Sequence, residues 1–202
     1  MNYQPYFRLE PSFLDDFTKT LIIGTTPPMR FTQGLEKEND DVDFYYGSCD
    51  NYFWDLIGDV FNVKLLRENS NLAIEQRKSI LSKHSMGLID IVNEFERKEK
   101  NASDANINVL KYSDLIAILE KNKNISKIFF TGGATESMVS KYLGQNKIYN
   151  TVISKDSPKQ KVFLIQERKI NSFTLFSPSP RVIAVKSYDT ILKQYKTFLS
   201  DF

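Results

Sequence analysis

Thr20-Leu-Ile-Ile-Gly-Thr-Thr-Pro-Pro28 is the stretch of sequence that decides the fold. Its first half is short, apolar and β-branched, and a glycine and two prolines follow, which is typical of a buried strand that runs into a loop. Strands that are apolar at consecutive positions are covered on both faces of their sheet. Residues 20–24 therefore predict a central strand, and residues 24–28 predict a loop at its carboxyl end.

More apolar runs of the same kind follow along the chain. Residues 87–92 and 128–133 are typical of buried strands, and residues 161–170 and 172–177 predict two further strands. The last of these strands ends in Ser177-Pro-Ser-Pro180, a second loop that contains prolines. We expect all these strands to belong to one sheet.

Segments with helical spacing of apolar residues separate the strands. The predicted helices cover residues 53–61, with Asp50 as a candidate cap, and residues 72–83, 113–119, 138–143 and 187–199. Strands that alternate with helices imply a mainly parallel sheet with helices on both faces. The predicted fold class is therefore α/β, a three-layer α/β/α sandwich that binds ligands beyond the carboxyl ends of its strands.

The composition is that of an ordinary globular protein. With 202 residues, 41% of them hydrophobic and 26% charged, the chain fits a single domain over residues 1–202. No apolar run approaches the ~20 residues that span a bilayer, and residues 1–10 lack a secretory pattern, so we expect a cytoplasmic protein without a membrane partner. Cys49 and His84 are the only cysteine and histidine, which predicts no metal and no cofactor.

The charges are distributed unevenly along the chain. Residues 1–120 carry 13 basic and 20 acidic side chains, whereas residues 121–202 carry 14 basic and 5 acidic ones. A basic half attracts phosphate backbones, although a lysine-rich solvated surface gives the same count. The charge pattern therefore supports a nucleic-acid partner only together with other features.

Three segments resemble, in the same order, motifs of the uracil-DNA glycosylase superfamily, and most closely those of its hypoxanthine or deoxyinosine glycosylase branch. They are Ile22-Ile-Gly-Thr-Thr-Pro-Pro28, Tyr45-Tyr-Gly-Ser-Cys-Asp-Asn-Tyr-Phe-Trp54 and Leu175-Phe-Ser-Pro-Ser-Pro180. The resemblance implies that the first loop lies beneath the deoxyribose and the flipped base, and that the last contacts DNA phosphates. It covers most of the chain.

The resemblance also implies an activity. Members of the superfamily hydrolyse the N-glycosidic bond of a deaminated base, which begins base-excision repair and requires the nucleotide to be flipped out of the stack. We therefore expect a monofunctional DNA N-glycosylase for uracil or hypoxanthine. Its partner is duplex or single-stranded DNA with a damaged base, and no obligate protein partner is evident.

The first loop departs from the superfamily pattern at Thr26, where many members have an aspartate or asparagine that handles the attacking water. A threonine hydroxyl is neither an anion nor a strong base at neutral pH. The hypoxanthine branch is thought to use the asparagine of its Asn-x-Phe-Trp segment, which falls on Asn51. Asn51 is thus the catalytic candidate, with Asp50 and Asp43 as alternative bases and a helix-start role as the alternative for Asn51 itself.

The remaining candidate residues belong to two groups. The expected base and sugar pocket consists of Gly24, Thr25, Thr26, Pro27, Tyr45, Tyr46 and Asp90, and the expected DNA contacts are Ser177, Ser179 and Arg181. Arg181 follows the last motif, where relatives place the wedge that fills the gap left by the flipped nucleotide. Each has a structural alternative, because turns use serines, cores use tyrosines, and a buried aspartate can be a satisfied structural carboxylate.

Two other functions remain open from the sequence. One is a non-catalytic nucleic-acid-binding member of the superfamily, which Thr26 would suit, and the other is a hydrolase of free nucleosides or nucleotides. An excision assay with parallel binding measurements separates these possibilities from a glycosylase.

Overall fold

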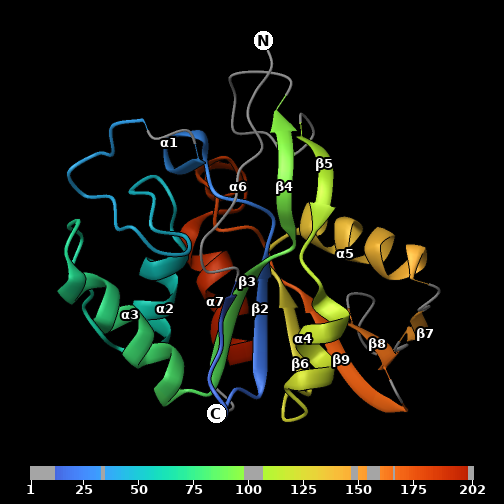
Figure 1. Cartoon of the computed structure of the whole chain (residues 1–202). Helices are drawn as coiled ribbons and strands as arrows, with labels where there is room; N and C mark the ends of the chain where they lie inside the picture. Colours follow the sequence, from blue (N-terminus) through green and yellow to red (C-terminus); the bar gives the residue numbers. More distant parts are fainter. Residues whose placement is uncertain are drawn as a thin grey trace.

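Seven strands form one sheet in this computed structural model, which describes residues 12–32, 35–97, 107–146, 150–153, 160–165 and 167–199 (Figure 1). Their order is β1-β3-β2-β6-β9-β8-β7. Their bounds are Ser12–Phe13 (β1), Thr20–Gly24 (β2), Met86–Asp90 (β3), Lys127–Phe130 (β6), Asn150–Ile153 (β7), Gln160–Ile165 (β8) and Arg168–Thr174 (β9).

The four central strands, β3, β2, β6 and β9, are parallel. Ile23 of β2 lies opposite Ile89 on one side and Phe130 on the other, and Phe130 pairs in turn with Thr174. The outer strands β1, β8 and β7 are antiparallel to their neighbours, and β1 and β7 form the two edges. The prediction of a mainly parallel sheet is confirmed, and residues 20–24 form a buried interior strand as expected.

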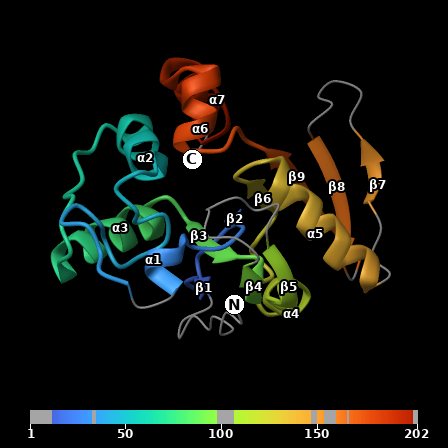
Figure 2. The same ribbon diagram turned by 90° about the horizontal axis from the view of Figure 1, so that it is seen from above.

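Helices cover both faces of the sheet (Figure 2). Ile22 packs with α2, α3 and α7, whereas the adjacent Leu21 and Ile23 pack with α4 and α5 on the opposite face. This alternation explains why residues 21–23 are all apolar, and it confirms the three-layer arrangement. The helices are α1 (Met29–Thr32), α2 (Phe53–Phe61), α3 (Asn71–Lys83), α4 (Leu115–Lys121), α5 (Gly133–Gln145), α6 (Pro180–Lys186) and α7 (Tyr188–Leu199).

Several predicted boundaries were wrong. The run 87–92 belongs to two strands, because β3 ends at Asp90 and β4 (Val92–Arg97) pairs with β5 (Ile107–Tyr112) in a separate antiparallel ribbon that no local signal announces. The expected strand 161–170 is broken by a turn at Glu167, whose φ of 66° is left-handed. The predicted strand end at 131–133 is instead the turn into α5, which begins at Gly133 and continues past Gly144.

The predicted helix caps also need correction. Asp50 does not cap α2; instead the Asn51 side-chain oxygen accepts a hydrogen bond from the Phe53 backbone N–H at 2.9 Å. Helix α4 begins after Asp114, rather than at Ser113, and the Asp114 carboxylate accepts from the Ala117 N–H.

Within the described ranges, no helix has the length and apolar character that a membrane crossing requires.

Candidate functional site

A cavity of about 910 Å³ lies beyond the carboxyl ends of the central strands. The loop after β2, the end of β3, the turn after β6 and the segment after β9 all contribute to its wall, as does the segment of residues 35–52 that precedes α2. Its lining includes Thr25, Thr26, Pro27, Pro28, Arg30, Tyr46, Ser48, Asp50, Asn51, Asp90, Thr131, Thr135, Ser177, Ser179 and Arg181. In Figure 1, α1 and α6 lie at this end of the sheet.

Gly24 allows two other side chains to approach the end of β2. A Cβ atom at this position would lie 2.7 Å from the Asp90 Oδ1 atom and would overlap the Tyr46 hydroxyl. Both distances are too short for a real Cβ contact, so a side chain at residue 24 would force Tyr46 and Asp90 to shift. Gly24 therefore forms the floor beneath Tyr46 and Asp90 rather than a ligand contact of its own.

Tyr46 links the 35–52 segment to the strands. Its ring stacks on Phe53 with centroids 4.2 Å apart, and its hydroxyl lies 2.7 Å from the Thr131 hydroxyl. Because Thr131 donates its own proton to the Ile23 carbonyl oxygen at 3.1 Å, the Tyr46 hydroxyl is the donor to Thr131. These contacts hold the phenol at the cavity wall although Tyr46 has a left-handed φ of 54°.

The two threonines of the first loop differ in their surroundings. The Thr25 hydroxyl lies 2.9 Å from the Thr135 hydroxyl of α5, which joins the loop to that helix. The Thr26 hydroxyl is buried and has no hydrogen-bond partner among the described residues. A buried hydroxyl without a partner is costly. Thr26 lines the cavity, but its hydroxyl is almost fully buried behind the cavity surface.

Asn51 lines the cavity and also helps to begin helix α2. Its amide oxygen accepts the Phe53 N–H, and its backbone N–H donates to the Ser48 carbonyl oxygen at 2.9 Å. The next residue, Tyr52, donates its N–H to the Pro178 carbonyl oxygen at 3.0 Å. The segment that contains Asn51 is thus fastened to the Ser177–Pro180 loop across the cavity.

The serines of the last loop accept local backbone hydrogen bonds. Ser177 accepts from the Ser179 N–H at 3.3 Å, and Ser179 caps α6 by accepting from the Val182 N–H at 3.4 Å. A hydroxyl that accepts one bond still has a proton to donate, so these turn contacts are compatible with phosphate binding. Arg181 is exposed at the edge of the same cavity.

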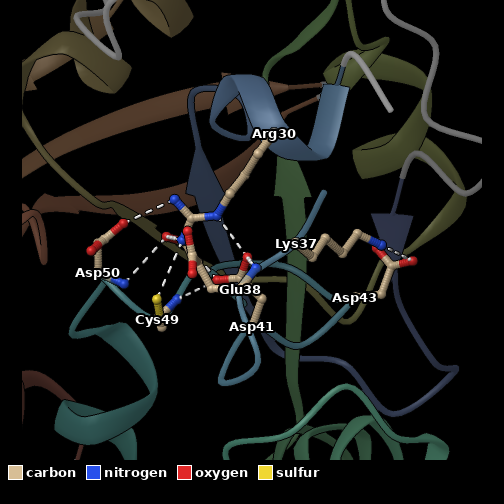
Figure 3. A network of polar contacts seen from close by, with 8 residues as sticks. Arg30, Lys37, Glu38, Asp41, Asp43, Cys49 and Asp50 are labelled. Carbon is tan, nitrogen blue, oxygen red and sulfur yellow. Dashed lines mark hydrogen bonds and ion pairs between the residues drawn. The ribbon is translucent and has the colours of Figure 1, made fainter. Parts of the chain in front are cut away.

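Arg30 joins the α1 side of the cavity to the 35–52 segment through a network of ion pairs (Figure 3). Its Nε and Nη2 atoms donate to both carboxylate oxygens of Asp41 at 2.6 and 2.7 Å. Nη2 also donates to the Ser48 hydroxyl at 2.8 Å, and Nη1 pairs with Asp50 at 2.9 Å. The guanidinium charge is therefore met by two carboxylates within the protein.

Asp41 is the buried centre of this network, with a fully buried side chain. Burial alone would raise the pKa of Asp41, but hydrogen bonds from Arg30 and from the Cys49 and Glu38 N–H groups outweigh burial. They lower the pKa from 3.8 to about 2, so the carboxylate stays ionised at neutral pH. The hydrogen bond with Asp41 likewise raises the pKa of Arg30 above its ordinary value.

The structure brings most of the predicted site residues together at the cavity, but Gly24 and Tyr45 do not line it. Tyr45 is buried in the core with Phe53 and Trp54 and does not line the cavity, so the core alternative for this tyrosine holds. The left-handed backbone at Tyr46 sends the second of these adjacent tyrosines to the cavity instead. Asp43 is exposed and pairs with Lys37.

Several residues line the cavity without having been predicted, among them three with polar side chains. These three are Arg30, Ser48 and Thr135. Ser48 lies within the Tyr45–Trp54 motif, but nothing in the local sequence separates its side chain, or those of Arg30 and Thr135, from ordinary polar surface residues. Only the first of them could have been suspected, since Arg30 follows the Pro27-Pro28 turn of the first loop.

We also considered a second cavity and possible metal-binding groups as alternative functional sites. A second cavity, of about 750 Å³, lies along α2 beside Arg67 and Tyr188 and contains no predicted site residue. Among the described residues, no group of three or more histidine, cysteine, aspartate or glutamate side chains is arranged to hold a metal ion. The cavity at the carboxyl ends of the strands is therefore the candidate active site.

The fold and the position of the cavity define an α/β protein with a ligand site at the carboxyl edge of a mainly parallel sheet. One similar solved structure is the solution NMR structure of a protein from Methanosarcina acetivorans named a "putative Uracil DNA glycosylase". The TM-score is 0.63 and the identity 18%, with 98% of this chain and 97% of the other covered. No protein-family model matches the sequence, and the search of curated proteins found no match. The similarity shows a fold like that of the archaeal protein.

The close approach at Gly24 leads to a first prediction. Gly24→Ala should lower the free energy of unfolding by about 1–3 kcal/mol, because the added methyl group displaces Tyr46 and Asp90. Urea unfolding measures the change. Gly133→Ala is the matched control, since a Cβ atom there meets nothing within 4 Å and alanine favours the helix. Equal losses in the two variants would contradict the steric requirement.

The low pKa of Asp41 leads to a second prediction. Since the pKa is lowered on folding, Asp41 stabilises the fold above about pH 4, and this contribution is lost as the pH falls toward 2. Between pH 5 and pH 3, the wild-type protein should lose about 1 kcal/mol more unfolding free energy than Asp41→Asn. Urea unfolding at both pH values gives the comparison. Asp43→Asn should retain the wild-type dependence, because its ion pair with Lys37 is exposed.

Proposed function

We propose that this chain, as a single domain, is a monofunctional DNA glycosylase that removes uracil or hypoxanthine from DNA. The observation that carries the proposal is the cavity itself. Three segments that resemble glycosylase motifs lie far apart in the sequence, yet residues 25–28, 50–51 and 177–180 line one cavity. Its volume of about 910 Å³ is suited to a nucleotide-sized ligand. The similarity to the archaeal protein supports a glycosylase-type fold.

The reaction replaces the C1′–N bond with a bond to water. The bond breaks with its electron pair on the base, the water oxygen attacks C1′, and the water proton passes to the base or to solvent. The sugar carries positive charge in the transition state, so the site must orient one water and stabilise a cation. No step requires a metal or an organic cofactor.

Asn51 is proposed to orient the attacking water. One lone pair of its amide oxygen accepts the Phe53 N–H, and a carbonyl-type oxygen has a second lone pair that can accept from water. Because Phe53 fixes the amide, the water would be held by a preorganised group. The Thr26 hydroxyl, buried without a described partner, is proposed as a second contact for the water or the sugar.

The proposed contacts with the base and the strand come from the other walls. Tyr46, which lines the cavity, is proposed to contact an extruded base, and aromatic contacts of this kind contribute about 1–3 kcal/mol per base. Asp90, at the end of β3, is proposed to face the sugar or the base. Ser177 and Ser179 would donate their free protons to phosphate oxygens, and Arg181 would enter the duplex beside the flipped nucleotide.

A second candidate function is non-catalytic binding of damaged DNA. It is favoured by Thr26, which has no acidic or amide group, and by the helix-start role that already occupies the Asn51 oxygen. Single-turnover excision assays on oligonucleotides with uracil, hypoxanthine or xanthine decide between the two. Excision supports the glycosylase, and binding without excision supports the second function. If the protein neither excises a base nor binds the oligonucleotides, a hydrolase of free nucleosides or nucleotides is favoured.

The role of Asn51 can be separated from its helix-start role by two substitutions. Asn51→Ala removes both functions, whereas Asn51→Ser keeps an oxygen that can cap α2 but is too short to hold the same water. Both variants should lower the single-turnover excision rate by about 10²–10³-fold, and only Asn51→Ala should lose about 1 kcal/mol of stability. Wild-type excision by Asn51→Ser would show that the residue is only a cap.

The role of Arg181 is tested by the salt dependence of DNA binding. Arg181→Ala should weaken duplex binding and reduce the slope of log Kd against log salt by about 1, because one phosphate contact is lost. Fluorescence anisotropy over a salt series measures both quantities. Lys123→Ala is the control, since Lys123 is exposed before the start of β6, at the amino ends of the parallel strands and away from the cavity. An unchanged slope in Arg181→Ala would exclude a phosphate contact.

A further inference from the structure

The 35–52 segment brings four side chains to the cavity without any helix or strand of its own. Tyr46, Ser48, Asp50 and Asn51 all line the cavity, and they all come from this irregular segment. Long irregular segments lose much conformational entropy on ordering, so their functional side chains must be held by tertiary contacts. Tyr46 is held through Thr131 and Phe53, which leaves the question of what holds residues 48–51.

Arg30 and Asp41 contact each of the three residues before Asn51. The Arg30 guanidinium donates to the Ser48 hydroxyl and pairs with the Asp50 carboxylate. Asp41 accepts the Cys49 backbone N–H at 2.8 Å through the same carboxylate oxygen that receives Arg30 Nη2. Figure 3 shows these contacts converging on the Arg30 guanidinium, which comes from α1.

The network is connected directly to the backbone of Asn51. The carbonyl oxygen of Ser48 accepts the Asn51 N–H at 2.9 Å, and the Ser48 side chain is held by Arg30. On the other side, the Asn51 amide oxygen and the Tyr52 N–H are fixed by Phe53 and Pro178. Asn51 is therefore held both by residues before it and by residues after it. On the preceding side, the restraint consists of side-chain contacts of Arg30 and Asp41 rather than of helix or strand hydrogen bonds.

We propose that Arg30 is a positioning residue: through Asp41, Ser48 and Asp50 it fixes the backbone of residues 48–51 and so aims the Asn51 amide into the cavity. This inference rests on the proposed function, in which Asn51 orients water. Arg30 itself is not a phosphate ligand, because two carboxylates already neutralise its charge. Its role requires the planar fork of arginine, since a lysine ammonium cannot reproduce the bidentate contact and the two further bonds.

The test compares Arg30→Gln and Arg30→Lys with a matched control in the same segment. Lys37→Gln removes the exposed ion pair between Lys37 and Asp43, which Figure 3 shows apart from the Arg30 contacts. The measurements are the single-turnover excision rate at saturating enzyme, the Kd for the oligonucleotide, and hydrogen exchange of the amides of residues 48–51. All three measurements are made on variants that circular dichroism shows to be folded.

Both Arg30 variants should lower the excision rate by about 10²-fold, the effect expected when a catalytic group is displaced by about 1 Å. The Kd should remain near the wild-type value, and the amides of residues 48–51 should exchange faster. Lys37→Gln should match the wild-type protein in all three measurements. Wild-type excision or unchanged amide exchange in Arg30→Gln would overturn the proposal, as would full activity in Arg30→Lys.

A double variant separates positioning from a general loss of structure. If Arg30 acts through Asn51, then Arg30→Gln combined with Asn51→Ser should excise no more slowly than Asn51→Ser alone. Multiplied losses in the double variant would overturn the proposal. If Arg30→Gln does not fold, Ser48→Ala removes a single bond from the guanidinium and should show a smaller loss of rate with faster exchange. Unchanged rate and exchange in Ser48→Ala would then count against it.

Failure of the proposed function would be recognisable separately. If the wild-type protein excises no base from any of the oligonucleotides, the glycosylase proposal fails, whereas the exchange measurement still tests Arg30. Faster exchange of residues 48–51 in Arg30→Gln, and not in Lys37→Gln, would support the positioning role in a site of another activity. Equal exchange in both variants would overturn it.

Discussion

The space left by Gly24 at the end of β2 is the constraint on which the cavity depends. Without a side chain there, the Tyr46 hydroxyl and the Asp90 carboxylate both come within van der Waals range of the strand. The Tyr46 hydroxyl then reaches the hydroxyl of Thr131, which follows the neighbouring strand β6. The Thr131 hydroxyl in turn donates a hydrogen bond to the Ile23 carbonyl oxygen of β2. The absence of a side chain at Gly24 thus lets the ends of three strands and an irregular segment meet at one point.

The second support of the cavity is the buried ion pair between Arg30 and Asp41. A buried carboxylate is tolerated only when its oxygens are satisfied, and Asp41 accepts two N–H groups from Arg30 and one each from Glu38 and Cys49. Such a pair adds little net stability compared with apolar packing, but it selects one arrangement of the chain. Here the selected arrangement is that of a segment without helix or strand, which needs such a restraint more than a strand does.

Local pattern was enough to predict the elements whose apolar residues repeat regularly, such as β2, α2, α3 and α7. The turn between β8 and β9 was missed because Glu167, rather than glycine, adopts the left-handed conformation. At the site, motif resemblance pointed to Asn51 and to the first and last loops, and residues from all three line one cavity. Asp41, however, lies in an acidic run with Asp40 and Asp43 that looks uniformly solvated. Only the fold decides that Asp41 is fully buried while Asp43 remains exposed.

The charges at the cavity suggest how one site would serve both a cationic transition state and an anionic strand. Among the described residues, the charged side chains that line the cavity are Arg30, Asp50, Asp90 and Arg181. Since Arg30 is neutralised internally, the carboxylates give the wall near Asn51 a negative character, which favours positive charge on the sugar and disfavours phosphate. Phosphates would then have to be bound on the side of the Ser177–Pro180 loop, where Arg181 is exposed and the serines retain protons to donate. This loop belongs to the basic half of the chain, so the uneven charge distribution is consistent with the proposed division between bond breaking and strand binding.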